Sequence, residues 1–390
     1  MTINNEHNKL NVPNLRFPEF QGEWEKHELG DICETITDFV AAGSFASLRE
    51  NVKYYQEDNY AQLVRTVDLK KDFTNNDFVY VDELAYDFLW RVQLKEPNIV
   101  LPNIGANIGE KYYVSPEDLP KEKNVLGPNA ILLRSKCNDT HFVYFRLSTS
   151  SYDNEMKKLV GASGQPKFNK TDLKKVRLFM PSLKEQKKIS HFLRLLDERI
   201  ATQNKIIDKL QSLIKGITQK IVCSNKPNVR LLECLECKSS TLQESDVCEH
   251  GTYPVYGANG IVGYLDNYNT EGEAVYIIKD GSGVGTVSYV TGKCSATGTL
   301  NTLQAKDGYS LQYLYYLLKV FCFEPYKTGM AIPHIYFKDY GKAKVFCPSY
   351  TEQLQYARFL SAIDNKLSAE QHILTNLSLQ KQYLLRQMFI

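Results

Sequence analysis

The chain has 390 residues, a formal net charge of +2, and 43% hydrophobic and 24% charged residues, which is ordinary for a water-soluble protein of two or three domains. No apolar run approaches the ~20 residues that a membrane-spanning helix needs. Residues 1–10 are polar and lack the apolar core of a signal peptide. These features argue against membrane and secreted classes, and we expect a cytoplasmic protein that does not act at a membrane.

The nine cysteines are an odd number, scattered and mostly inside hydrophobic stretches, which is typical of reduced thiols. Cys234 and Cys237 form a CxxC motif with Cys248 and His250 downstream, a pattern that zinc can use. There is no second CxxC, and the first half of the chain has no counterpart. We therefore expect no metal site, and the role of Cys234 and Cys237 stays open.

The first globular segment, residues 1–183, is predicted to mix strands with short helices. The run NIVLPNIGANIGEKYYV, which begins at Asn98, places Gly105 and Gly109 between two stretches of β-forming residues. This pattern predicts a strand, a turn and a second strand. A helix is expected over residues 140–148, whereas residues 38–60 have no counterpart elsewhere in the chain.

Residues 184–222 are predicted to form a long helix. Apolar residues recur there in alternating steps of four and three, as in the seam of a coiled coil, with one polar break at Gln203 and no proline. Pro181-Ser182 precedes the helix, so a serine can cap it while Glu185 lies in its first turn. The seam residues are Ile189, Leu193, Leu196, Ile200, Ile207, Leu210, Ile214 and Ile217.

The second globular segment, residues 223–350, repeats the first. Its run AVYIIKDGSGVGTVSYV begins at Ala274 and aligns with the earlier hairpin at an offset of 176 residues, Gly281 and Gly285 matching the earlier glycines. Thr286 stands where a dinucleotide-binding loop would need its third glycine, so a tight hairpin is favoured over a phosphate loop. A helix is expected over residues 310–321, at the place that matches residues 140–148.

Residues 351–390 repeat the long helix at an offset of 167 residues, and Glu370 falls in the slot of Gln203. A repeat of this kind divides the chain into two half-proteins of the same plan. The seam residues of this second helix are Leu360, Ile363, Leu367, Leu374, Leu377 and Leu384.

Charge is unevenly distributed along the chain. Residues 166–230 carry 16 Lys and Arg against 5 Asp and Glu, whereas residues 30–165 and 231–332 are net acidic. A basic stripe along a long helix suits a polyanion or an acidic partner, although a solvated helix face would have the same composition.

Each half ends in the same way before its helix. The first has GASGQPKFNKTDLKKVRLFMPSLKEQ from Gly161, and the second has GMAIPHIYFKDYGKAKVFCPSYTEQ from Gly329. The glycine, the following proline, the alternating strand, the Pro-x-x-x-Glu-Gln motif and the long helix together resemble the specificity subunits of type I restriction–modification systems. The LRFPEFQGEWEKHELGDI run from Leu15 and the YPVYGANGIVGY run from Tyr253 extend this resemblance over nearly the whole chain.

The resemblance implies an α+β fold with a pseudo-twofold internal repeat. Two mixed α/β target-recognition domains, residues 1–183 and 223–350, would be separated by two long antiparallel coiled-coil helices, residues 184–222 and 351–390. Each domain would recognise one half of a bipartite, asymmetric sequence in double-stranded DNA, and the helices would set the spacer and dock two methylation subunits. S-adenosylmethionine would bind those partners, and ATP and Mg would bind two restriction subunits in the full complex. This chain would hold no cofactor itself.

The sequence agrees with a non-catalytic role for this chain in an adenine-N6 methyltransferase and ATP-dependent endonuclease complex. It contains no Pro-Pro, so the Asn/Asp-Pro-Pro-aromatic motif of adenine methyltransferases is absent, and Gly292-Lys293 is followed by Cys294 rather than by the Ser or Thr of a Walker loop. No cluster has acid–base spacing, and we name no catalytic residue. A stand-alone methyltransferase-like protein and a coiled-coil scaffold without a nucleic-acid role remain the alternatives.

Candidate DNA-binding residues are polar or basic side chains at the loops shared by both halves, because such groups bind base edges and phosphates. A solvated loop residue is the plain alternative for each of them. In the first half they are Arg65, Thr66, Asn103, Asn107, Lys111, Ser163, Gln165 and Lys167. In the second half they are Tyr256, Asn259, Lys279, Ser282, Thr286, Thr299, His334, Tyr336 and Lys338.

Overall fold

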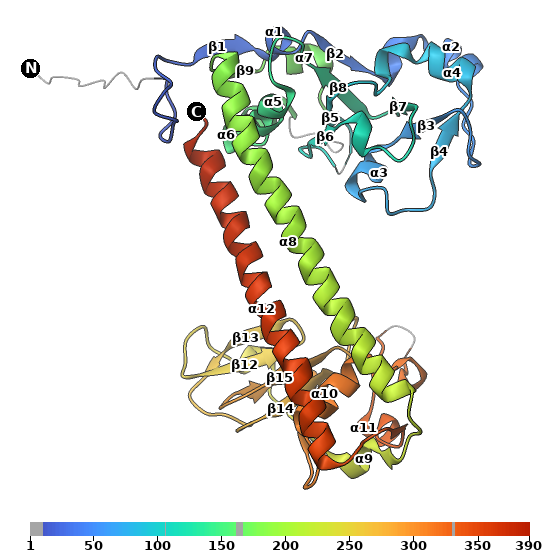
Figure 1. Cartoon of the computed structure of the whole chain (residues 1–390), viewed down its shortest axis with the longest axis vertical. Coiled ribbons are helices and arrows are strands. Elements are labelled where there is room, and N and C mark those ends of the chain that lie inside the picture. Colours follow the sequence, from blue (N-terminus) through green and yellow to red (C-terminus); the bar gives the residue numbers. More distant parts are fainter. Residues whose placement is uncertain (1–10, 106, 161–166, 330–331) are drawn as a thin grey trace, which may run out of the picture. The chain divides into compact units, whose positions relative to one another are not determined.

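The computed structural model describes residues 11–105, 107–160, 167–329 and 332–390. The chain divides into two compact units, unit 1 with Met1–Ile200 and Asn376–Ile390, and unit 2 with Ala201–Thr375. Two long helices, α8 (Leu183–Cys223) and α12 (Tyr350–Gln387), each contribute to both units (Figure 1). Among the described residues, no helix has the length and apolar character needed to cross a bilayer.

Unit 1 places a mixed set of short strands and helices before α8. In chain order they are β1 (Glu25–Glu28), α1 (Leu29–Ile32), β2 (Thr35–Asp38), η1 (Phe39–Ala42), α2 (Phe45–Asn51), β3 (Ala61–Val64), α3 (Thr66–Lys70), β4 (Val79–Val81), α4 (Glu83–Phe88), η2 (Trp90–Val92), β5 (Asn98–Pro102), β6 (Tyr112–Val114), η3 (Pro116–Asp118), β7 (Asn124–Leu126), β8 (Ala130–Arg134), α5 (Thr140–Leu147), α6 (Ser150–Val160), α7 (Lys170–Lys174) and β9 (Arg177–Met180).

Unit 2 has a similar series between the two long helices. In chain order it contains β10 (Val229–Arg230), α9 (Leu231–Cys234), β11 (Leu235–Ser239), η4 (Glu244–Asp246), β12 (Tyr253–Gly257), β13 (Gly260–Leu265), β14 (Ala274–Ile278), β15 (Val287–Val290), β16 (Ser295–Ala296), β17 (Leu300–Ala305), α10 (Leu311–Val320), η5 (Glu324–Tyr326), α11 (Phe337–Tyr340) and β18 (Lys344–Val345).

The two units have the same sheet topology. Unit 1 has a four-stranded sheet of order β2-β8-β5-β6 and a three-stranded sheet of order β4-β3-β7; unit 2 has β11-β17-β14-β15 and β13-β12-β16. In each three-stranded sheet the centre strand pairs antiparallel with one neighbour and parallel with the other. The predicted internal repeat of two mixed α/β halves is confirmed. So are the two hairpins, β5–β6 and β14–β15, and the helices α5 and α10.

The two long helices pack antiparallel through the predicted seam. In unit 1, Leu193 and Leu196 of α8 share a buried core with Leu377 and Leu384 of α12. In unit 2 the corresponding core contains Ile207, Ile214, Leu360 and Leu367, and Leu210, Ile217, Ile363 and Leu374 pack against it. Ile189 is buried and Ile200 is partly buried in the unit 1 core. In each unit the buried interface between the two helices is therefore made of the apolar residues that recur in steps of four and three.

The polar break in both seams is a single buried contact in unit 2. The side-chain amide of Gln203 donates to the Glu370 carbonyl oxygen at 3.0 Å and also to the Glu370 carboxylate. Lys366, one helical turn before Glu370, forms an ion pair with the same carboxylate. A buried polar side chain is tolerated in a seam when its hydrogen bonds are made, and such a pair disfavours other helix registers.

The Pro-x-x-x-Glu-Gln motif anchors each long helix to its own globular part. The Gln186 side-chain oxygen accepts from the Asp139 backbone N–H at 3.0 Å, and Gln353 accepts from that of Ser310 at 2.9 Å. Asp139 and Ser310 are the N-caps of α5 and α10. Each glutamine also donates to the carbonyl oxygen of the motif's proline, so it connects three segments.

Candidate nucleic-acid interface

In unit 2 the candidate residues after β14 gather beside the segment that contains His334. The Lys279 N–H donates to the Thr299 carbonyl oxygen at 3.0 Å, and the Lys279 carbonyl oxygen accepts from the Ile335 N–H at 2.9 Å. The ring centroids of His334 and Tyr336 are 5.1 Å apart, and the Lys338 ammonium lies 5.1 Å from the Tyr336 ring. Residues far apart in sequence therefore form one surface with cationic, aromatic and hydroxyl groups.

The β14–β15 turn exposes two of its candidates, Ser282 and Thr286. Gly281 and Gly285 have φ angles of +94° and +90°, which only glycine adopts without strain. A β-carbon on Gly285 would also lie 3.1 Å from the Phe323 ring. The glycines therefore shape the turn and leave binding to the side chains around them.

Tyr256 and Asn259 belong to the three-stranded sheet and its turn. The Tyr256 carbonyl oxygen accepts from the Thr297 N–H at 2.9 Å, and the hydroxyls of Thr297 and Thr299 are 2.8 Å apart. Asn259 is exposed in the turn between β12 and β13. Thr299 thus connects the Tyr256 sheet with Lys279 in the four-stranded sheet.

In unit 1 the structure brings some of the candidates together. The Asn103 carbonyl oxygen accepts from the Phe168 N–H at 3.2 Å, and Lys167 forms an isolated bridge with Ile104. The Asn107 side chain accepts from Lys70 at 3.0 Å. Lys111 instead forms an ion pair with Asp153 of α6. Ser163 and Gln165 lie outside the described residues.

Arg65, which caps α3, is held by its neighbours. Its guanidinium donates to the Asp68 carboxylate at 2.7 and 3.0 Å and to the Asp77 carbonyl oxygen at 2.6 Å, while Thr66 is the half-buried first residue of the helix. The hydrogen bond to Asp68 raises the pKa of Arg65, so its charge is fixed. Base recognition by Arg65 would require its release from Asp68, whose side chain is fully buried.

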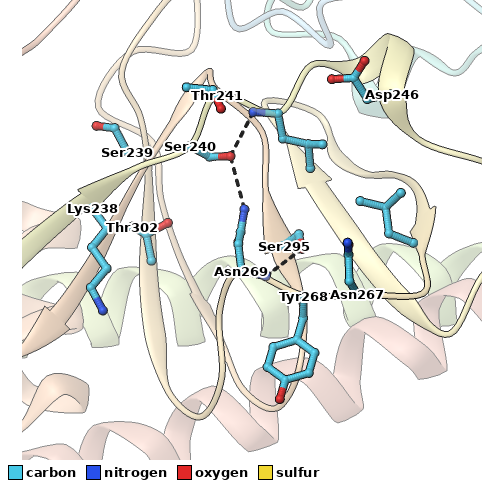
Figure 2. Close-up of a pocket in the computed structure, with 12 residues that line it drawn as sticks. Lys238, Ser239, Ser240, Thr241, Asp246, Asn267, Tyr268, Asn269, Ser295 and Thr302 are labelled. Carbon is cyan, nitrogen blue, oxygen red and sulfur yellow. Dashed lines mark hydrogen bonds between the residues drawn. The ribbon is translucent and has the colours of Figure 1, made fainter.

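A polar pocket in unit 2 was not identified from the sequence (Figure 2). It measures about 680 Å³ and lies against the face of the four-stranded sheet that carries Thr302. Most of the residues around it carry hydroxyl, amide or charged groups. They are Lys238, Ser239, Ser240, Thr241, Leu242, Asp246, Leu265, Asn267, Tyr268, Asn269, Ser295 and Thr302.

Asn269 holds one wall of this pocket in place. Its side-chain amide donates to the Ser240 hydroxyl at 3.2 Å, and its backbone N–H donates to the Ser295 hydroxyl at 3.0 Å (Figure 2). The amide also donates to the Ala296 carbonyl oxygen at 3.1 Å. The Leu242 N–H also donates to Ser240, at 3.1 Å. The Leu242 carbonyl oxygen accepts from the Gly298 N–H, directly before Thr299, so a backbone hydrogen bond connects the pocket wall to the segment of that candidate residue.

Among the described residues, no group of three or more His, Cys, Asp or Glu side chains could hold a metal ion. Cys234 is buried with its sulfur 3.9 Å from that of Cys347, and Cys237 lies on β11.

The sequence model of the type I restriction modification DNA specificity domain matches residues 21–212 and again residues 228–379. A putative type I restriction enzyme specificity subunit of Methanocaldococcus jannaschii is 27% identical over 218 residues, 54% of this chain and 48% of that protein. The EcoprrI specificity subunit of Escherichia coli is 27% identical over 112 residues, 29% of this chain and 28% of that protein. The chain thus spans about half the length, or less, of these curated relatives.

Solved structures share the fold. The S subunit of a type I restriction–modification system from M. genitalium matches with a TM-score of 0.65 at 17% identity, covering 97% of this chain and 99% of that chain. A chain from a study of assembly and conformational transition in the type I system matches with a TM-score of 0.52 at 14% identity, covering 95% and 98%.

Proposed function

We propose, from the premise that this chain belongs to the type I restriction–modification DNA specificity family, that it is the non-catalytic subunit that selects the DNA sequence on which its complex acts. The observation that carries the proposal is the double match of the family to two units of identical sheet topology. Two similar but not identical binding surfaces suit a target made of two different half-sites.

Each unit would bind one half of an asymmetric, bipartite target in double-stranded DNA. In unit 2 the turn residues Ser282 and Thr286 and the aromatic–cationic group around Tyr336 would face the duplex. In unit 1 the segment around Asn103 and Lys167 would do the same. Hydroxyl, amide and ammonium groups recognise base edges and phosphates in this way.

The two long helices would set the unspecified spacer and dock the partners. Two methylation subunits would bring S-adenosylmethionine, and two restriction subunits would bring ATP and Mg in the complete cytoplasmic complex. The helices suit this role because their seam is buried in each unit while their outer faces carry exposed side chains such as Phe359 and Leu379.

The test is to map methylated adenines in DNA from a host that carries this chain together with its methylation subunit. We expect methylation at one bipartite, asymmetric recognition sequence, here called the methylated word, and no methylation there when this chain is omitted. The purified chain, added to mixed duplexes without the partner, should bind weakly because its globular segments are net acidic. No methylated word in a host that produces both folded proteins would refute the proposed function.

A further inference from the structure

Thr302, in the centre of the four-stranded sheet of unit 2, has a hydroxyl without a protein partner. The residue is only 6% exposed, and no hydrogen bond of its side chain exists among the described residues. The hydroxyl oxygen is not enclosed by protein but borders the pocket, where solvent or a ligand can reach it. Figure 2 shows the Thr302 oxygen between Lys238 and Asn269, directed into the pocket.

The equivalent position in unit 1 is filled by a core residue. Thr302 of β17 pairs with Tyr276 of β14 on one side and with Lys238 of β11 on the other. In unit 1, Leu132 of β8 pairs in the same way with Val100 of β5 and with Thr37 of β2. Leu132 is fully buried within an apolar core. The fold therefore accepts a leucine here, and threonine is not needed for packing.

The groups around Thr302 are arranged with opposite charges at two sides of the pocket. Lys238 and Asp246 lie on opposite sides in Figure 2. Asn267 is exposed and lines the pocket with a side-chain amide that has no partner among the described residues. An ammonium group suits a phosphate, whereas a carboxylate repels phosphate and accepts from the amino group of a base.

We propose that this pocket receives one nucleotide of the half-site bound by unit 2, and that Thr302 is a specificity-determining residue for its base. Thr302 and Asn267 bind the edge of the base, Asp246 accepts from its amino group, and Lys238 pairs with the adjoining phosphate. The inference rests on the proposed function, because the ligand is the target DNA. It adds that the half-sites differ partly because Leu132 closes the equivalent position in unit 1.

The decisive variant is Thr302→Val, which keeps the shape of the side chain and removes only the hydroxyl. Because that hydroxyl has no protein partner, thermal stability should be unchanged or raised. The selectivity of the methylating complex should fall roughly tenfold at one base pair of one half-site, the usual effect of losing a base contact. The other half-site should stay unchanged.

Two further variants control this test in the same host with the methylation subunit. Thr218→Val makes the same substitution at a buried threonine of α8 in unit 2, whose hydroxyl donates to the Ile214 carbonyl oxygen at 2.8 Å. It should leave the methylated word unchanged. Lys238→Gln should lower methylation of all targets alike without altering the word, because phosphate contacts carry no sequence information.

A Thr302→Val variant with the wild-type word and selectivity would overturn the inference while leaving the proposed function intact. A variant that loses activity together with thermal stability would show that Thr302 is a packing residue, and this also overturns it. If the wild-type complex methylates no bipartite word, the proposed function itself fails and the inference fails with it.

Discussion

Arg16 fixes an N-terminal strap, residues 11–24, onto the start of α8 through a buried carboxylate. Its guanidinium makes two hydrogen bonds to Glu185, at 2.7 and 2.8 Å, and the Glu185 side chain is only 2% exposed. Trp24 donates to the same carboxylate at 3.3 Å. Arg16→Ala would therefore leave a buried negative charge with one neutral donor.

We expect Arg16→Ala to destabilise unit 1 by about 3 kcal/mol, the lower end for breaking a buried ion pair, because Arg16 itself is partly exposed. For a unit of this size the unfolding midpoint should fall by roughly 6–12 °C. Thermal unfolding of the full chain, with hydrogen exchange to assign the transition to residues 11–24 and the start of α8, measures the effect.

The internal repeat supplies a matched control for this prediction. Glu352 occupies the place of Glu185 in unit 2, yet it is exposed, and its one partner among the described residues is Ser349, whose hydrogen bonds lower the pKa of Glu352. Glu352→Gln should leave unit 2 nearly unchanged. Adding Glu185→Gln to Arg16→Ala should recover much of the loss, because it removes the unpaired charge. A loss under about 1 kcal/mol for Arg16→Ala, or no recovery in the double variant, would refute the reasoning.

Three other outcomes follow from the same structure. Gln186→Ala and Gln353→Ala should each destabilise their own unit by about 2 kcal/mol, because the N-cap N–H of Asp139 or Ser310 loses its acceptor, and hydrogen exchange in α5 or α10 reports it separately. Burial lowers the pKa of His141 to about 4, so between about pH 6.5 and 4 the imidazole is protonated in the unfolded chain but neutral in the folded chain. Unit 1 should therefore lose stability as the pH falls through this range. His141→Gln should flatten this pH dependence, measured by unfolding at a series of pH values. Replacing residues 231–332 by those of a relative should change one half-site of the methylated word, and a change in both would disprove independent recognition.

The helices and hairpins could be predicted from the sequence because their signals are local. The alternating steps of four and three persist through both long helices, and paired glycines mark the hairpin turns. The hydrogen-bond partners of individual side chains were harder to predict from the sequence. Arg65 stays a predicted DNA-binding residue, and its guanidinium bonds to Asp68 three residues later, a spacing at a helix start that is visible in the sequence.

The pocket around Thr302 could not be predicted in the same way. Its walls come from the end of β11, the segment before β14, and β17, which are far apart in sequence. The offset that aligns the two hairpins also does not by itself pair Thr302 with Leu132, since that match needs the strand register on both sides. Only the folded sheet shows that a core position of one unit lines a pocket in the other.

The two units share the contacts that hold the fold together but differ in side chains on the face of the four-stranded sheet. Gln186 and Gln353 make the same two hydrogen bonds in both units, so the attachment of each helix to its sheet is fixed by geometry. At the centre of the sheet, by contrast, the backbone pairing is identical while the side chain changes from Leu132 to Thr302. Backbone hydrogen bonds hold β8 and β17 in place whatever side chain they carry. This face of the sheet can therefore change its side chains without loss of the strand order, which is what the proposed recognition of two different half-sites requires of two half-proteins of one plan.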